Sequence, residues 1–249
     1  MKVKLITMTN NPVAAVAAAA RRCYSGLGNN EMFDFMAGKL DEDAEYLEKF
    51  IRKVLASGHD GILEAASFTF AIEGVSRALS HQLVRHRAGC SFAQQSQRYV
   101  ENAFGGEWYI VPASIAEKPE ALTLYKSLMD RVALYYGMFL EMGIPKEDAR
   151  YVLPNATETK LIVTMNARAL LHFFRLRCCN RSQWEIRALA EAMLKEAQRV
   201  AGVLFEKGGA PCEHGPCPEG AMSCKSPKKG GRHIEANGLE SYVGPCDAL

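Results

Sequence analysis

The chain has 249 residues, 48% of them hydrophobic and 23% charged, so it can bury a full core without disulfide staples. Thirty Lys and Arg against 28 Asp and Glu give a formal net charge of +2, which excludes general polyanion binding through bulk charge. No apolar run approaches the roughly 20 residues of a membrane helix, and the first residues lack the apolar centre of a secretory signal. We therefore expect a cytoplasmic protein with no membrane partner.

Hydrophobic periodicity and helix-breaking residues divide the chain into strands and helices. We expect strands over 3–7, 67–73, 108–111 and 159–165, and helices over 11–24, 41–57, 76–85, 119–142, 166–176 and 182–207. Asp41 is expected to cap the second helix, and Ser182 with Glu185 has the spacing of a capping box. The order lacks regular βαβ alternation, which predicts an α+β fold with mixed helices around a central, mostly antiparallel sheet.

The composition changes after Lys207, because the last 42 residues hold eight of the 20 glycines and five of the ten prolines. We predict a domain over 1–207 and an extended Gly/Pro/Cys-rich tail over 208–249. Cys212, His214, Cys217 and two further tail cysteines would suit tetrahedral zinc. Their Cys-x4-Cys-x6-Cys spacing is not that of most zinc knuckles, so free thiols in a mobile tail are favoured and no metal is predicted.

The densest polar cluster of the chain lies over 85–99, where three Arg, one His, three Gln and two Ser occur without an acidic residue. Such side chains bind phosphates and flat polar heterocycles. A bare Arg-His-Arg is more often a solvated basic face, but that face would usually carry Lys and Glu instead of amides and hydroxyls. The small net charge and the lack of Lys runs disfavour a nucleic-acid patch.

This stretch resembles the signature of the flavin-dependent thymidylate synthases, which is Arg-His-Arg, a short spacer and then Ser-x-Arg. Further segments match the family in order: 19–24, 57–60, 67–70, Gln82, 149–154, 166–168 and 183–185. The resemblance spans about residues 1–207. Chance does not explain so many segments in the same order.

The resemblance implies a methyltransferase that converts dUMP to dTMP without a protein nucleophile. Methylenetetrahydrofolate would supply the carbon, and FAD reduced by NADPH would supply the hydride. It also implies a homotetramer in which several chains build each active site, with no nucleic-acid partner.

The resemblance further assigns site residues position by position. FAD would be contacted by Cys23, His59, Arg85, His86, Arg87, Gln94, Asn166, Arg168 and His172. The substrate would be contacted by Gln82, Gln94, Gln95, Ser96, Gln97, Arg98, Tyr99, Arg150 and Arg177. Arg177 would also be the catalytic cation, because hydride addition builds negative charge on the uracil carbonyl oxygens. His59 and Tyr99 would lie where folate stacks on the flavin, and Ser96 would be a ligand.

The sequence departs from the family pattern at several positions. The spacer between Arg87 and Ser96 is one residue longer than usual, so one residue, such as Gly89, must bulge out. Gly61 stands where a hydroxyl is commoner, and His172 replaces an amide. These changes concern the flavin pocket and leave two alternatives open, a catalytically inactive flavin- or nucleotide-binding protein and a nucleic-acid-binding module.

Overall fold

The sheet at the centre of the molecule has four antiparallel strands. The computed structural model describes residues 1–101, 104, 108–226 and 228. The strands are β1 (Lys2–Met8), β2 (Ser67–Ser76), β3 (Cys90–Gln94) and β4 (Glu158–Asn166), in the order β1-β2-β4-β3. The predicted α+β class with an antiparallel sheet is confirmed.

Two sequence expectations for the strands are wrong. The predicted strand over 108–111 is reduced to a single bridge between Tyr109 and Thr157, because Pro112 follows and cannot donate a ladder hydrogen bond. The unpredicted strand β3 lies inside the polar cluster, where Ser91 and Ala93 are exposed on one face. As an edge strand, β3 pairs with β4 alone, so its sequence does not need the hydrophobic alternation of a central strand.

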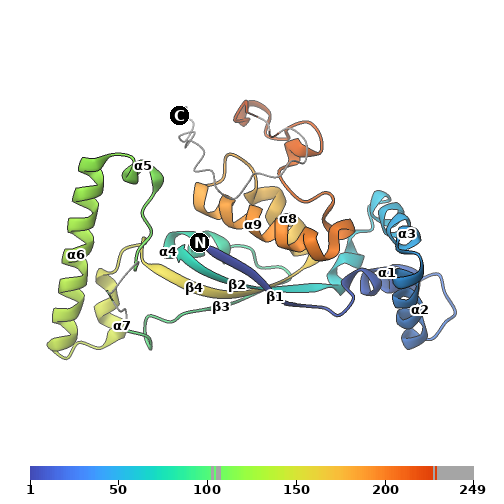
Figure 1. Cartoon of the computed structure of the whole chain (residues 1–249), viewed down its shortest axis with the longest axis horizontal. Coiled ribbons are helices and arrows are strands. Elements are labelled where there is room, and N and C mark those ends of the chain that lie inside the picture. The colour runs from blue at the N-terminus through green and yellow to red at the C-terminus, as the bar shows by residue number, and fades with distance from the viewer. Residues whose placement is uncertain (102–103, 105–107, 227, 229–249) are drawn as a thin grey trace.

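Two long helices cover one face of the sheet, as Figure 1 shows. They are α8 (Ala167–Arg177) and α9 (Trp184–Ala201). Phe68, Phe70 and Val163 alternate toward them along the strands and are fully buried. On the opposite face Ile162 is 49% exposed, and no helix of the described residues covers it.

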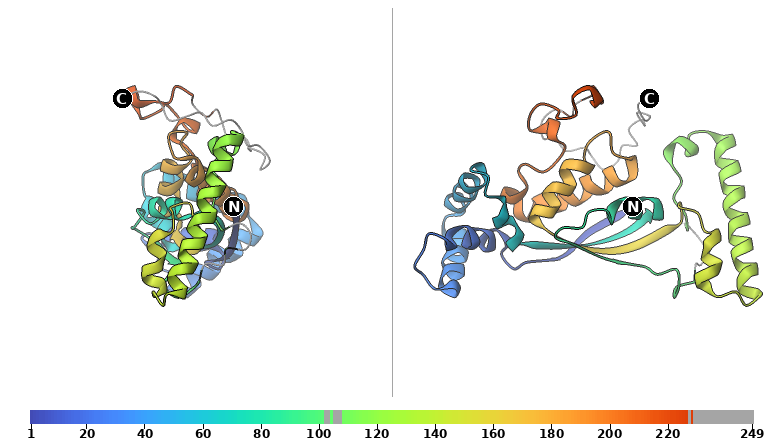
Figure 2. Two further views of the ribbon diagram at one scale, coloured as in Figure 1. Left: turned by 90° about the vertical axis from the view of Figure 1, so that its left-hand side faces the viewer. Right: turned by 180° about the vertical axis from the view of Figure 1, so that it is seen from behind.

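The other helices form two units at opposite ends of the sheet (Figures 1 and 2). One unit holds α1 (Pro12–Arg22), α2 (Asn29–Glu42) and α3 (Ala44–Ala56), and the other holds α5 (Ala113–Ala116), α6 (Pro119–Glu141) and α7 (Lys146–Ala149). The short α4 (Arg77–Leu83) follows β2 directly. Helix α2 was not expected from the sequence, and it buries only Met32 and Met36.

The predicted caps of two helices are wrong by one or two residues. Asp43, and not Asp41, caps α3, and its Oδ1 accepts from the Tyr46 N–H at 3.0 Å, because Asp41 still belongs to α2. Gln183, and not Ser182, caps α9. The Glu185 carboxylate turns into the core instead, where it accepts from the Ser76 N–H at 2.7 Å and from the Ser76 hydroxyl at 2.5 Å.

Residues after Lys207 pack on the domain over the α8–α9 junction. Helix α9 ends at Ala201 and a short 3-10 turn, Gly202–Phe205, follows, so the helix does not reach 207 as predicted. Ala210 is fully buried. The boundary at 207 stays a prediction, and residues 229–249, including Cys246, lie outside the described residues. In the part that the structure describes, no helix combines the length and apolar character needed to cross a membrane.

Candidate functional site

The site lies where β3 begins and β4 ends. Cys90, the first residue of β3, pairs with Met165 near the end of β4, and α8 starts two residues later. The backbone oxygen of Gly89 accepts from the N–H of Asn166 at 3.0 Å. This pairing places the Arg85-His86-Arg87 segment, which follows α4, against the N-terminal turn of α8.

Gly89 is required at this junction by both its backbone and its neighbours. Its φ is +68°, in the left-handed region, and a Cβ at this position would lie 2.4 Å from Nδ2 of Asn166. Asn166 in turn caps α8, because its Oδ1 accepts from the Ala169 N–H at 2.8 Å. The turn that contains Gly89 therefore lies within the longer spacer and fixes the position of Asn166.

The first cavity, of about 660 Å³, opens at this junction. It is lined by Glu64, Arg85, His86, Arg87, Ala88, Gly89, Cys90, Asn166, Arg168, Ala169, His172, Leu176 and Arg177. Seven of these residues are predicted site residues, six of them for FAD. Four arginines face one carboxylate, that of Glu64, which accepts from Arg168 at 2.6 Å. The cavity is therefore cationic and suits an anionic ligand.

His86 holds Arg177 in place inside this cavity. The Nε of Arg177 donates to Nε2 of His86 at 3.0 Å, and the His86 ring packs edge-on against Phe173. Only 8% of His86 is exposed. Burial, Arg177 and His172 lower the pKa of His86 to about 4, so the ring is neutral at pH 7 and Nε2 is an acceptor. That bond assigns the ring proton to Nδ1.

The Arg177 guanidinium remains a cation, although burial and the neighbouring Arg85 lower its pKa. Its Nη nitrogens have no protein partner among the described residues. They are free to donate to a bound ligand, while Nε is fixed by His86. The pair is a cation held in one orientation, which suits charge stabilisation in a reaction.

A second cavity, of about 610 Å³, adjoins the first. It is lined by Gln82, His172, Arg175, Leu176, Arg177, Cys179, Arg181, Ser182, Gln183, Pro211, Cys212, Cys217, Pro218 and Glu219. His172, Leu176 and Arg177 line both cavities. Arg177 therefore faces both spaces, and Gln82 from the predicted substrate set belongs to the second.

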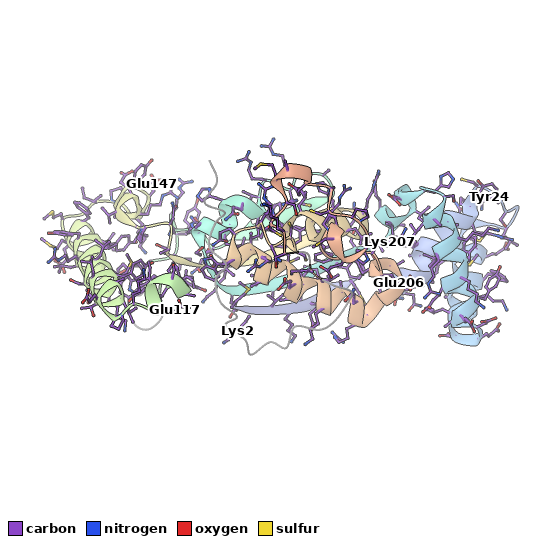
Figure 3. All side chains as sticks on the ribbon, turned by 90° about the horizontal axis from the view of Figure 1, so that it is seen from above. Lys2, Tyr24, Glu117, Glu147, Glu206 and Lys207 are labelled. Carbon is purple, nitrogen blue, oxygen red and sulfur yellow. The ribbon has the colours of Figure 1, made fainter. Side chains whose placement is uncertain are left out.

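The remaining predicted substrate residues lie at the other end of β3. Arg98 Nε donates to Glu147 at 2.8 Å, and Arg150 Nε donates to the Glu147 backbone oxygen at 3.0 Å. Figure 3 shows Glu147 at the α5–α7 end of the molecule. The Gln97 side chain accepts from Arg77, whose pKa is lowered by burial and by Arg150.

None of the predicted residues from Gln94 to Tyr99, nor Arg150, lines either cavity. Gln94 donates instead to the hydroxyls of Ser80 and Thr159, and the Gln95 N–H donates to the Lys160 oxygen. At about 3.3 Å per residue, an extended strand from Cys90 to Ser96 covers about 20 Å. One chain thus carries two separate groups of predicted site residues.

Two further predicted residues lie apart from both cavities. His59 is exposed at the start of the 3-10 turn Asp60–Ala65, and Cys23 is exposed at the end of α1. Tyr24, the neighbour of Cys23, is at the opposite end of the molecule from Glu147 in Figure 3.

Comparison with known proteins gives the family. A family model described as "Thymidylate synthase complementing protein" matches residues 4–202. The chain belongs to this family. Two relatives named flavin-dependent thymidylate synthase, from Geobacter sulfurreducens and Clostridium tetani, are 50% and 46% identical to it. Both matches cover 90% of this chain, with 94% and 93% of the respective relatives.

A solved structure of the same fold supports this assignment. The UMP/dUMP methylase PolB from Streptomyces cacaoi, crystallised with 5-Br dUMP, superposes with a TM-score of 0.69 at 27% identity. The match covers 83% of this chain and 93% of PolB. The resemblance to the flavin-dependent thymidylate synthases drawn from the sequence is confirmed.

Several lining residues of this family member are not predicted from its sequence. Glu64 follows the matched segment 57–60 by four residues, and Cys90 lies inside the signature over 85–99, so these places in the sequence were the available signal. Arg175, on the predicted helix over 166–176, and Arg181, in the turn after it, are equally consistent with ordinary surface charges. The lining residues after Lys207 gave no signal, because a Gly/Pro-rich composition predicts an extended tail.

No metal site is found in the described part of the tail. Within residues 1–101, 104, 108–226 and 228, no three His, Cys, Asp or Glu side chains are placed to hold a metal ion. Cys212, Cys217 and Cys224 are free thiols. The zinc alternative for these three cysteines therefore has no geometric support.

Proposed function

We propose that the chain is a flavin-dependent thymidylate synthase, a methyltransferase that converts dUMP to dTMP. Methylenetetrahydrofolate is the carbon donor and NADPH the reductant in this proposal. The observation that carries it is the first cavity, where Arg85, His86, Arg87, Asn166, Arg168, His172 and Arg177 converge. These residues come from two distant segments, and the resemblance assigns six of them to FAD and the seventh to the uracil ring.

The residues of the first cavity fit FAD in charge, and the volume of the cavity fits a cofactor. The pyrophosphate of FAD is a dianion, which planar arginine forks bind in a bidentate manner. Arg85, Arg87 and Arg168 supply such forks, and Asn166 lies at the positive N-terminal end of α8. A volume of about 660 Å³ falls within the usual range of cofactor pockets. FAD, when bound, supplies the hydride.

Arg177 is the catalytic cation in this proposal. Addition of hydride to the uracil ring places negative charge on its carbonyl oxygens, and a guanidinium aimed at them stabilises the transition state. His86 fixes Nε of Arg177 and leaves the Nη nitrogens for the ring. Arg177 also faces both cavities, so the substrate base and the cofactor can meet beside it.

The phosphate of dUMP is bound, we propose, by Ser96, Gln97, Arg98 and Arg150, with Tyr99 near the folate. About 20 Å of extended chain separates Cys90 in the first cavity from Ser96, and none of the proposed phosphate ligands lines either cavity. A second chain must therefore supply them to the site around Arg177, which favours the homotetramer. The uncovered face of the sheet and the exposed α6 side chains Leu124 (74%) and Leu134 (60%) are surfaces for such an assembly.

The cytoplasm is the compartment we propose. All cysteines of the described residues, from Cys23 to Cys224, are free thiols. Free thiols persist in the reducing cytosol.

Turnover by the purified protein tests the proposal. After addition of FAD and removal of unbound flavin, the protein should retain a bound-flavin spectrum that changes when dUMP is added. With methylenetetrahydrofolate and NADPH, it should then form dTMP. Retention of FAD and dUMP without dTMP would contradict the enzyme and indicate an inactive binding protein. Salt-sensitive binding of long nucleic acid without dUMP binding would indicate a nucleic-acid module.

A further inference from the structure

One wall of the second cavity is built by residues that follow the family-matched region. The match to the family model ends at residue 202, yet Pro211, Cys212, Cys217, Pro218 and Glu219 line the cavity. The match to the Geobacter sulfurreducens relative covers 90% of this chain, which is too long to end at 207. That relative therefore shares part of the segment over 208–226, here named the C-terminal segment.

The C-terminal segment is fixed to the domain at both of its ends. Near its start, Ala210 is fully buried and belongs to the hydrophobic core of the domain. Farther along, Glu219 pairs with Arg181 at 2.6 Å. The Asn180 amide donates to the Ser226 oxygen at 2.9 Å. These contacts hold the intervening residues over the α8–α9 junction as an ordered wall.

The chemistry of the second cavity favours an anionic ligand with a flat polar ring. Arg175, Arg177 and Arg181 face it, and the one lining carboxylate, Glu219, is already paired with Arg181. Gln82 can donate to and accept from a ring edge. Prolines and cysteines of the C-terminal segment give the opposite wall an apolar character.

We propose that the C-terminal segment is part of the nucleotide site, where it closes the second cavity over dUMP beside Arg177. The proposal rests on the proposed function. The residues with which the C-terminal segment lines the cavity are prolines and cysteines, apart from Glu219, whose carboxylate is neutralised by Arg181. The segment therefore excludes water and retains the ligand, and it takes no part in proton or hydride transfer. Substitutions in the C-terminal segment that disturb this wall should raise the KM for dUMP and have a small effect on kcat.

The first test fills the cavity from the C-terminal segment. Cys217→Phe places a ring into the second cavity, whereas Ala221→Phe places the same ring on an exposed position of the same segment. We expect Cys217→Phe to raise the KM for dUMP about tenfold or more, because steric overlap costs more than about 1.4 kcal/mol of binding. The Ala221→Phe control should stay near wild type, and both variants should retain flavin. An unchanged KM in Cys217→Phe would overturn the proposal.

The native cysteines give a second test that needs no variant. Cys212 and Cys217 line the second cavity, Cys90 lines the first, and Cys23 lines neither. Alkylation by iodoacetamide, followed at each site by mass spectrometry, should be slowed by dUMP at Cys212 and Cys217 and be unchanged at Cys23. FAD should slow it at Cys90.

Each result of the second test separates this proposal from the proposed function. If the enzyme forms dTMP but dUMP leaves Cys212 and Cys217 as reactive as before, the C-terminal segment is no part of the site. Equal slowing at Cys23 would also overturn the proposal. Absence of turnover refutes the enzyme assignment, and protection of the two cysteines would still support a nucleotide site here.

Discussion

The bond from Arg177 to His86 joins a neutral imidazole ring to the cation that we assign to catalysis. A hydrogen bond that involves a charged group contributes about 1.5–3 kcal/mol. An arginine without it keeps its charge but samples several orientations, so His86 is a positioning residue. Loss of His86 should therefore lower kcat more than it raises the KM for dUMP.

Replacement of His86 by Phe should lower kcat by about tenfold to 100-fold, because the acceptor for Arg177 is lost. His86→Gln keeps an oxygen that can accept the same bond and should recover much of that loss. Steady-state kinetics with varied dUMP would measure both, and retained flavin absorbance would show that FAD still binds. Equal losses in the two variants would mean that His86 acts in another way.

The low pKa of His86 also makes folding depend on pH. The folded chain keeps His86 neutral down to about pH 4, whereas the unfolded chain protonates it near 6.5. Between these values the unfolded state binds more protons, so this contribution to the free energy of unfolding is present above 6.5 and is lost as pH falls toward 4.

Urea unfolding of the flavin-free protein at pH 7, 5.5 and 4.5 would measure this dependence. The wild type should lose more stability over this range than His86→Gln, which has no titrating group at this position. Other titrating groups are common to both proteins and cancel in the difference. Parallel pH profiles for the two proteins would show that His86 is protonated alike in both states.

At the scale of elements, the junction of β3 with α8 depends on Gly89. Gly89→Ala introduces a Cβ against Asn166 and strains a left-handed backbone, which costs about 1–3 kcal/mol. Asn166 can move only at the expense of its cap on α8. We expect a lower melting temperature and weaker flavin retention.

Gly61→Ala is the matched control, because a Cβ there meets nothing within 4 Å and its φ is not in the left-handed region. It should leave the melting temperature and flavin retention nearly unchanged. If both glycine variants behave alike, the loss does not come from the contact with Asn166.

The sequence predicts some of the strands and helices and misses others. Strands β1, β2 and β4 and helices α6 and α8 are predicted because each has a hydrophobic period and a clear break, as at Gly143 after α6. Strand β3 is missed because it is a polar edge strand, and α2 because few of its residues are buried. The first cavity follows from matched motifs, whereas the wall over 208–226 depends on contacts with α8 and α9 that local composition does not encode.

At the scale of the whole molecule, the homotetramer that we propose would bring the two groups of predicted site residues together between chains. Arg177 lies at the first cavity, and Arg98 lies with Glu147 at the α5–α7 end. Arg177→Ala and Arg98→Ala should each abolish most activity, because every site lacks one of the two cations. In mixed assemblies, some sites will combine the intact Arg177 of one chain with the intact Arg98 of another.

Co-expression of the two variants with different tags, followed by purification on both tags, would isolate such assemblies. Random pairing of half-sites should restore activity to about a quarter of the wild-type level per site. A mixture of Arg177→Ala with His86→Phe should not recover, because both changes affect the same half-site. If the Arg177→Ala and Arg98→Ala mixture stays inactive, one chain must bring both residues to its own site, which would require β3 and the α5–α7 unit to rearrange.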